Sequence, residues 1–70
     1  MMPLTMMNAG ENGTVQRITG NDETRRFLEN LGFVEGTTVS VVSTIDGNLI
    51  VNVKDSRVAI DKSMANRIMV

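Results

Sequence analysis

The chain has 70 residues, no cysteine, no histidine, and a formal net charge of −1 from seven basic and eight acidic residues. This length predicts one domain over residues 1–70, with a small core because a domain of this size buries only about 60% of its unfolded surface. The missing cysteines exclude disulfides and thiolate metal sites, and the missing histidines remove the commonest general base and metal ligand. The balanced charge argues against nucleic-acid binding, which normally needs a basic excess.

The N-terminal segment, residues 1–7, holds four of the six methionines. Such a segment could form an adaptable docking surface. The interpretation we favour is a strand or turn that packs Leu4 and one methionine onto the core. The segment lacks the basic start and long apolar run of a signal peptide, and no run in the chain approaches the roughly 20 apolar residues of a membrane span. We therefore expect a cytoplasmic protein that does not insert into a membrane.

Turn-forming residues over 8–13 predict a tight loop. The loop lacks the Gly-Lys-Ser/Thr ending of a phosphate-binding loop. Residues 14–19 then indicate a strand, although Val15 and Ile18 lie three positions apart and break the alternation of a regular strand. A β-bulge in a strongly bent strand would bring both side chains to the core.

A helix is predicted over about residues 22–31, with Asn21 as its N-cap and two acidic residues in its first turn. Gly32 follows the last apolar residue, at the position where a left-handed residue usually closes a helix. The opposite face carries charges whose spacing allows the ion pairs Asp22–Arg26 and Arg25–Glu29. An apolar stripe recurs at i, i+3, i+4 and i+7: Thr24, Phe27, Leu28 and Leu31.

After Gly36, residues 37–44 predict a strand with two valines on one face. Asp46-Gly47 is a strong hairpin signal, because both turn positions need positive φ. The next strand, 48–54, alternates most clearly along the chain. Its apolar face carries Leu49, Val51 and Val53.

Lys54 and Asp55 form a second turn, and residues 56–60 return as a strand with Val58 and Ile60 inward. Asp61 can cap a short helical turn over about 62–66, held by packing of Met64 and Ala65. Residues 67–70 end the chain as a strand that could pair with the first strand. The order of elements is mainly β and predicts a small antiparallel barrel of about five strands, whose closure would leave no exposed edges.

No catalytic pattern is visible among the carboxylates. Asp22, Glu23, Asp46 and Asp61 have cap or turn roles, and the other acidic residues form no nucleophile–base arrangement. We therefore expect no enzyme activity and no bound cofactor. The acidic residues also lack the spacing of a calcium-binding loop, so we expect no resident metal site. Proline-rich peptide binding needs aromatic grooves, whereas the chain has two phenylalanines and no tyrosine or tryptophan.

An ordered set of short motifs runs through the chain: Leu31–Gly36, Val39–Val41, Gly47–Val53, Val58–Ile60 and Ala65–Val70. This set resembles the FeoA family (ferrous iron transport protein A), whose core domain is shared with the C-terminal part of iron-dependent repressors. The resemblance implies an SH3-like barrel and no iron ligands at named positions. The motif residues with structural explanations include Leu31, Gly32, Gly36, Gly47 and Ala59.

The resemblance also implies a cytoplasmic accessory protein of bacterial ferrous iron uptake, with a FeoB-type membrane transporter as partner and its GTP-binding cytoplasmic domain as the contact. The exposed charges expected to touch the partner are Arg25, Arg26, Glu29, Lys54 and Arg57. An arginine could act in trans on a GTPase, although ordinary solvated charges are the simpler interpretation. The alternative function is a regulatory domain that docks on, or resembles, the C-terminal domain of an iron-dependent repressor.

Overall fold

The computed structural model describes residues 1–70 and confirms a mainly β, SH3-like fold. One main helix is present, and the strands number six rather than five. The elements in chain order are the 3-10 turn η1 (Leu4–Met6), β1 (Asn12–Thr14), β2 (Arg17–Ile18), α1 (Asp22–Leu31), β3 (Thr38–Ile45), β4 (Asn48–Val53), β5 (Ser56–Ile60), α2 (Lys62–Ala65) and β6 (Ile68–Met69).

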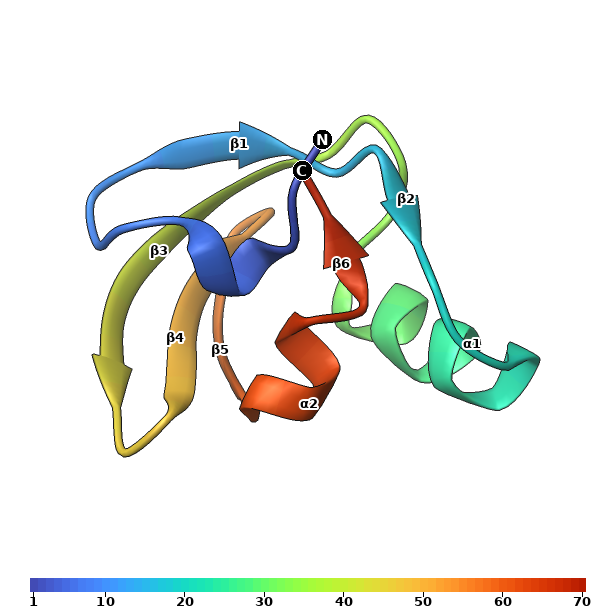
Figure 1. The fold of residues 1–70 in the computed structure, drawn as a ribbon. Helices are drawn as coiled ribbons and strands as arrows, with labels where there is room; N and C mark the ends of the chain where they lie inside the picture. Colours follow the sequence, from blue (N-terminus) through green and yellow to red (C-terminus); the bar gives the residue numbers. More distant parts are fainter.

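The strands form two separate antiparallel sheets. One has four strands in the order β1-β3-β4-β5, and the other pairs β2 with β6. Figure 1 shows the larger sheet curving around α2 and η1, with β2, β6 and α1 on the opposite side. The predicted closure of the barrel is therefore wrong. The sheet stays open because the first strand leaves it after β1 and pairs with β6, while β5 runs directly into α2.

The change of sheet occurs at Val15 and Gln16. The Val15 N–H donates to the Thr37 carbonyl (2.9 Å), and the Val15 carbonyl accepts from the Gly36 N–H (2.8 Å). The next residue, Gln16, donates its N–H to Met69 of β6 (2.8 Å). This switch of partner explains the three-residue spacing of the apolar side chains, since Val15 is buried in the core and Ile18 packs against it. Gln16 and Arg17 both face Met69, which is the two-against-one arrangement of the predicted bulge.

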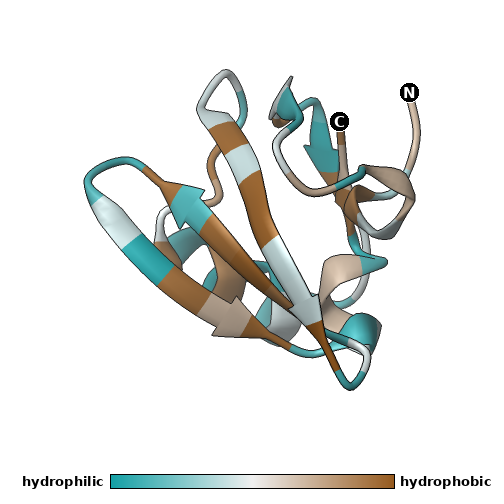
Figure 2. Ribbon diagram, turned by 90° about the vertical axis from the view of Figure 1, so that its left-hand side faces the viewer, coloured by the Kyte–Doolittle hydropathy of each residue, from teal (hydrophilic) through white to brown (hydrophobic).

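The core is built largely from the inward faces of β3 and β4. Figure 2 shows the alternation of apolar and polar residues along these strands. Leu4 is fully buried and Met7 is 6% exposed, so the N-terminal segment packs on the core as the favoured interpretation predicts. The buried side chains are Leu4, Met7, Val15, Leu28, Phe33, Val39, Val41, Leu49, Val51, Val53, Ile60, Ala65 and Ile68.

Helix α1 begins and ends as its sequence predicts. The Asn21 Oδ1 accepts a hydrogen bond from the Thr24 N–H (2.8 Å). Gly32 has φ 113°, its N–H donates to Glu29 (2.9 Å), and the Phe33 N–H donates to the Leu28 carbonyl (3.1 Å). These two bonds form a Schellman motif, which turns the chain back under the helix.

This turn explains a wrong prediction on the apolar stripe. Phe27 was expected to face the core, but its side chain is 51% exposed. Phe33, delivered by the Gly32 turn, is fully buried beside Leu28 in the same core cluster. The small core therefore takes the phenylalanine after the helix and leaves Phe27 at the flank of the stripe.

The turns and the C-terminal elements follow the predicted chemistry. Asp46 and Gly47 have φ 52° and 83°, as a two-residue hairpin of type I′ requires. The Asp61 Oδ1 accepts from the Met64 N–H (2.8 Å) at the start of α2. Ala59 is exposed on β5 opposite Ile50, so its structural role lies in strand pairing rather than in the core.

Candidate functional site

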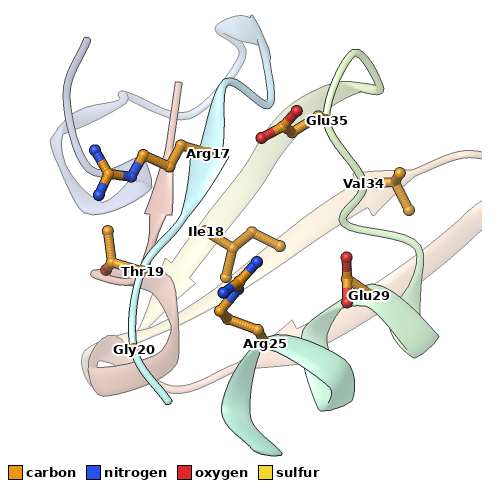
Figure 3. Close-up of a pocket in the computed structure, with 8 residues that line it drawn as sticks. All are labelled: Arg17, Ile18, Thr19, Gly20, Arg25, Glu29, Val34 and Glu35. Atoms are coloured by element: carbon orange, nitrogen blue, oxygen red, sulfur yellow. The ribbon is translucent and has the colours of Figure 1, made fainter. Parts of the chain in front are cut away.

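An open hollow of about 560 Å³ lies between β2, α1 and the loop that follows α1. It is the larger of two hollows on the molecule; the other, about 210 Å³, lies near Thr44, Gly47 and Lys62. Charged and apolar side chains share the lining of the larger hollow (Figure 3). Its lining residues are Arg17, Ile18, Thr19, Gly20, Arg25, Glu29, Val34 and Glu35.

The parting of two chain segments creates this hollow. β1 pairs with β3 as far as Thr14 and Thr38, and Val15 continues that pairing with Gly36 and Thr37. Beyond Val15 the first segment follows β6, while the segment before Gly36 turns away into α1. The space between them lies outside the core and is open to solvent.

Two elements aim side chains into the space. Arg25 and Glu29 lie four residues apart, one turn of α1, and both rise from the helix toward the hollow. Ile18 reaches in from β2, whereas Arg17, its neighbour on the strand, points away from the hollow (Figure 3). Glu35 extends from the loop toward β2.

The charges around the hollow are almost unpaired within the chain. The one ion pair of the protein joins Arg25 Nη1 and Asp22 Oδ1 at 3.8 Å, between side chains that are 51% and 88% exposed. The predicted pairs Asp22–Arg26 and Arg25–Glu29 do not form. Exposed helix pairs contribute only a few tenths of a kcal/mol, so little free energy favours one partner over another.

The structure brings together only part of the predicted contact set. Arg25 and Glu29 line the hollow, whereas Arg26 is exposed elsewhere on α1. Lys54 and Arg57 lie at the β4–β5 hairpin, where the Arg57 Nε donates to the Asn52 Oδ1 at 3.2 Å. The predicted contacts thus belong to more than one surface.

Sequence reasoning missed the β2 and loop residues of the hollow. Ile18, Thr19 and Gly20 come from β2 and its continuation, and Val34 and Glu35 come from the loop after α1. One signal was present, the broken alternation between Val15 and Ile18, which marks the point where the chain changes partner. This signal does not reveal the wall opposite β2, because that wall depends on where α1 and the loop after it dock on the core.

No group of three or more acidic side chains is placed so that it could hold a metal ion. Neither helix is long and apolar enough to cross a membrane.

Comparisons with known proteins give a consistent family. The FeoA domain model matches residues 2–70. A solved structure described as iron uptake regulatory protein (FeoA) is 34% identical, with a TM-score of 0.89 over 96% of this chain and 89% of that one. FeoA from Stenotrophomonas maltophilia in complex with zinc is 29% identical, with a TM-score of 0.85 over 99% of this chain and 88% of that one.

More distant matches share the fold. A manganese-dependent transcriptional repressor is 22% identical, with a TM-score of 0.86 over 94% of this chain and 38% of the repressor. A search of curated protein sequences finds no match. The family match over residues 2–70, together with the SH3-like fold, shows that the chain belongs to the FeoA family of ferrous iron transport.

Proposed function

We propose that the protein is a cytoplasmic accessory factor of bacterial ferrous iron uptake that acts by binding the GTP-binding cytoplasmic domain of a FeoB-type transporter. The observation that carries the proposal is the FeoA match over residues 2–70. The 34% identical relative is described as an iron uptake regulatory protein, and the Stenotrophomonas maltophilia relative as a proposed activating factor of ferrous iron transport. Both descriptions fit a partner-binding role.

The surface chemistry supports binding rather than catalysis. The carboxylates Glu29 and Glu35 share the hollow with Arg25, but no nucleophile–base pair lies among its lining residues. We propose Arg25 and Glu29 as the first partner contacts, with Arg26, Lys54 and Arg57 as further candidates on other surfaces. We expect the isolated chain to hydrolyse no GTP.

Calorimetric titration of the protein with the transporter's cytoplasmic domain, in its GTP-bound and GDP-bound forms, tests the proposal. We expect saturable binding that differs between the nucleotide states. Absence of heat and of any change in elution on size-exclusion chromatography, with both nucleotide forms at the highest attainable concentrations, would contradict it.

A second candidate is a domain that docks on an iron-dependent repressor. This candidate rests on the fold that the chain shares with the manganese-dependent repressor. The likeness is one of fold alone. The same titration with the repressor separates the two functions, because the first predicts binding only to the transporter domain and the second only to the repressor.

A further inference from the structure

We propose that the hollow receives an extended protein segment bearing lysine or arginine, which adds as a strand to the free edge of β2. The inference goes beyond the proposed function, because it concerns how a partner is recognised and holds whichever protein carries the segment. Three observations support it: a missing neighbour strand, a free strand edge, and carboxylates without counter-ions.

The missing neighbour follows from the path of the chain. Antiparallel pairing runs from β1–β3 to Val15, whose last bonds go to Gly36 and Thr37. If the segment before Gly36 had continued straight, it would have lain beside β2. It turns away toward α1 instead, so β2 has β6 on one side and no strand on the other.

The free edge of β2 faces the hollow. The Gln16 N–H donates to the Met69 carbonyl and the Thr19 N–H to the Arg67 carbonyl, both at 2.8 Å, so these bonds point toward β6 and flank Ile18. Figure 3 shows β6 on one side of β2 and the hollow on the other. An unpaired strand edge is a template for another strand, and many peptide-binding domains use it in this way.

The size and apolar walls of the hollow suit a short segment. Its volume of about 560 Å³ falls within the usual range of ligand sites, roughly 300–1,000 Å³. Ile18 is half-buried and turned toward the space, and Val34 is 39% exposed at its margin. Alternate apolar side chains of an added strand would contact Ile18, while the others would face α1 and the loop.

The charges select a basic occupant. Glu29 and Glu35 line the hollow without a lysine or arginine within ion-pair distance, since the protein's one ion pair is Arg25–Asp22. Arg17 points away from the space, whereas Arg25 rises toward it from α1 and forms its ion pair with Asp22, outside the hollow. Two carboxylates are therefore available to lysine or arginine side chains of the incoming strand.

The probe is an N-acetylated, C-amidated peptide of alternating valine and lysine, titrated into ¹⁵N-labelled protein. We expect amide shifts at residues 17–20 and 34–35, and slower hydrogen exchange along β2. The matching peptide of valine and glutamate should bind at least about fivefold more weakly, because it loses the exposed ion pairs to Glu29 and Glu35. Equal affinity of the two peptides, shifts confined to other surfaces, or no shift at millimolar peptide overturns the inference.

Backbone methylation separates strand addition from simple charge attraction. Successive amides of a strand point to opposite edges, so methylating alternate amides blocks one edge and leaves the other. One methylated isomer of the lysine peptide should retain binding and the other should lose it. Equal binding of the two isomers contradicts strand addition.

A protein variant completes the test. The double substitution Glu29→Gln and Glu35→Gln should lower affinity for the lysine peptide about fivefold, with no change for an all-valine peptide made soluble by a polar tail. Glu23→Gln, which removes an exposed carboxylate on the same helix outside the hollow, is the matched control and should leave both affinities unchanged. A peptide failure leaves the proposed function standing, because that function is tested with the transporter domain.

Discussion

The four-stranded sheet and the corner between β2 and α1 are built in opposite ways. In the sheet, Val39, Val41, Val51 and Val53 are each at most 1% exposed, and β3 and β4 have a paired strand on both sides. At the corner, β2 has two residues and one neighbouring strand, and charged side chains surround open space. The buried sheet therefore accounts for stability, and the corner is where we propose that a partner is recognised.

The two regions share one piece of chain. Residues 12–14, just before Val15, belong to the large sheet, and residues 17–20, just after it, line the hollow. Because Val15 is buried and bonded to both Gly36 and Thr37, the start of the open wall is held rigidly by the core. Under our proposal this anchor pre-organises the β2 edge, which would lower the entropic cost of binding.

Replacing Leu28 or its neighbour Phe27 by alanine should give the largest difference in the free energy of unfolding. Leu28 is fully buried and Phe27 is 51% exposed. We expect Leu28→Ala to lower the free energy of unfolding by about 3 kcal/mol, and Phe27→Ala by less than about 1 kcal/mol. Urea denaturation followed by circular dichroism measures both. Equal losses would show that the assignment of the two side chains is wrong.

Adding a side chain at Gly32 should lower the free energy of unfolding somewhat less than Leu28→Ala does. Gly32 has φ 113°, and an added Cβ would lie 3.3 Å from Val53 Cγ2. We expect Gly32→Val to lower the free energy of unfolding by about 2–3 kcal/mol. Gly36→Val is the control, because Gly36 also has positive φ (88°) but no atom within 4 Å of the added Cβ. A loss at Gly32 no greater than at Gly36 would refute a packing role for the helix end.

Removal of the N-cap should have a smaller effect that reaches the hollow. Asn21→Ala removes the hydrogen bond to the Thr24 N–H, and we expect a loss of about 1 kcal/mol together with faster hydrogen exchange in the first turn of α1. The exposed Asn30, whose side chain makes no hydrogen bond, is the control residue, and Asn30→Ala should leave both quantities nearly unchanged. Unchanged exchange in Asn21→Ala would mean that the cap does not hold this turn.

The smallest expected effect on stability lies at the hollow itself. Glu29 and Glu35 are exposed and have no ion-pair partner in the chain. Replacing both by glutamine should therefore change the free energy of unfolding by less than about 0.5 kcal/mol. A thermal or urea unfolding curve checks this. A loss comparable to that of Leu28→Ala would place these carboxylates in the structural part of the molecule.

Local signals predicted much of the fold. The bounds of α1, its Asn21 and Gly32 caps, and the Asp46-Gly47 turn were read directly from residues whose backbone preferences are strong. The resemblance to the FeoA family added the SH3-like fold, which the structure confirms. These features depend on neighbours in the sequence or on motif order.

The features that were not predicted depend on contacts between residues far apart in the sequence. Phe27 and Phe33 both fit an apolar site by sequence, and only the turn after Gly32 determines which of them fills it. The pairing of β6 with the first strand agrees with the prediction, but no local pattern specifies that this strand leaves the large sheet at Val15, which keeps the sheet open. The hollow arises from that same departure, so only Arg25 and Glu29 among its lining residues were predicted as contacts.

Amide chemical-shift mapping tests the division between sheet and corner most directly. The measurement titrates the transporter's cytoplasmic GTP-binding domain into the ¹⁵N-labelled protein and records which backbone amides move. We predict that the largest changes fall on residues 17–20, on the Arg25–Glu29 turn of α1 and on residues 34–35. Changes centred on the β4–β5 hairpin around Lys54 and Arg57, with residues 17–20 unmoved, would contradict the assignment of recognition to the corner.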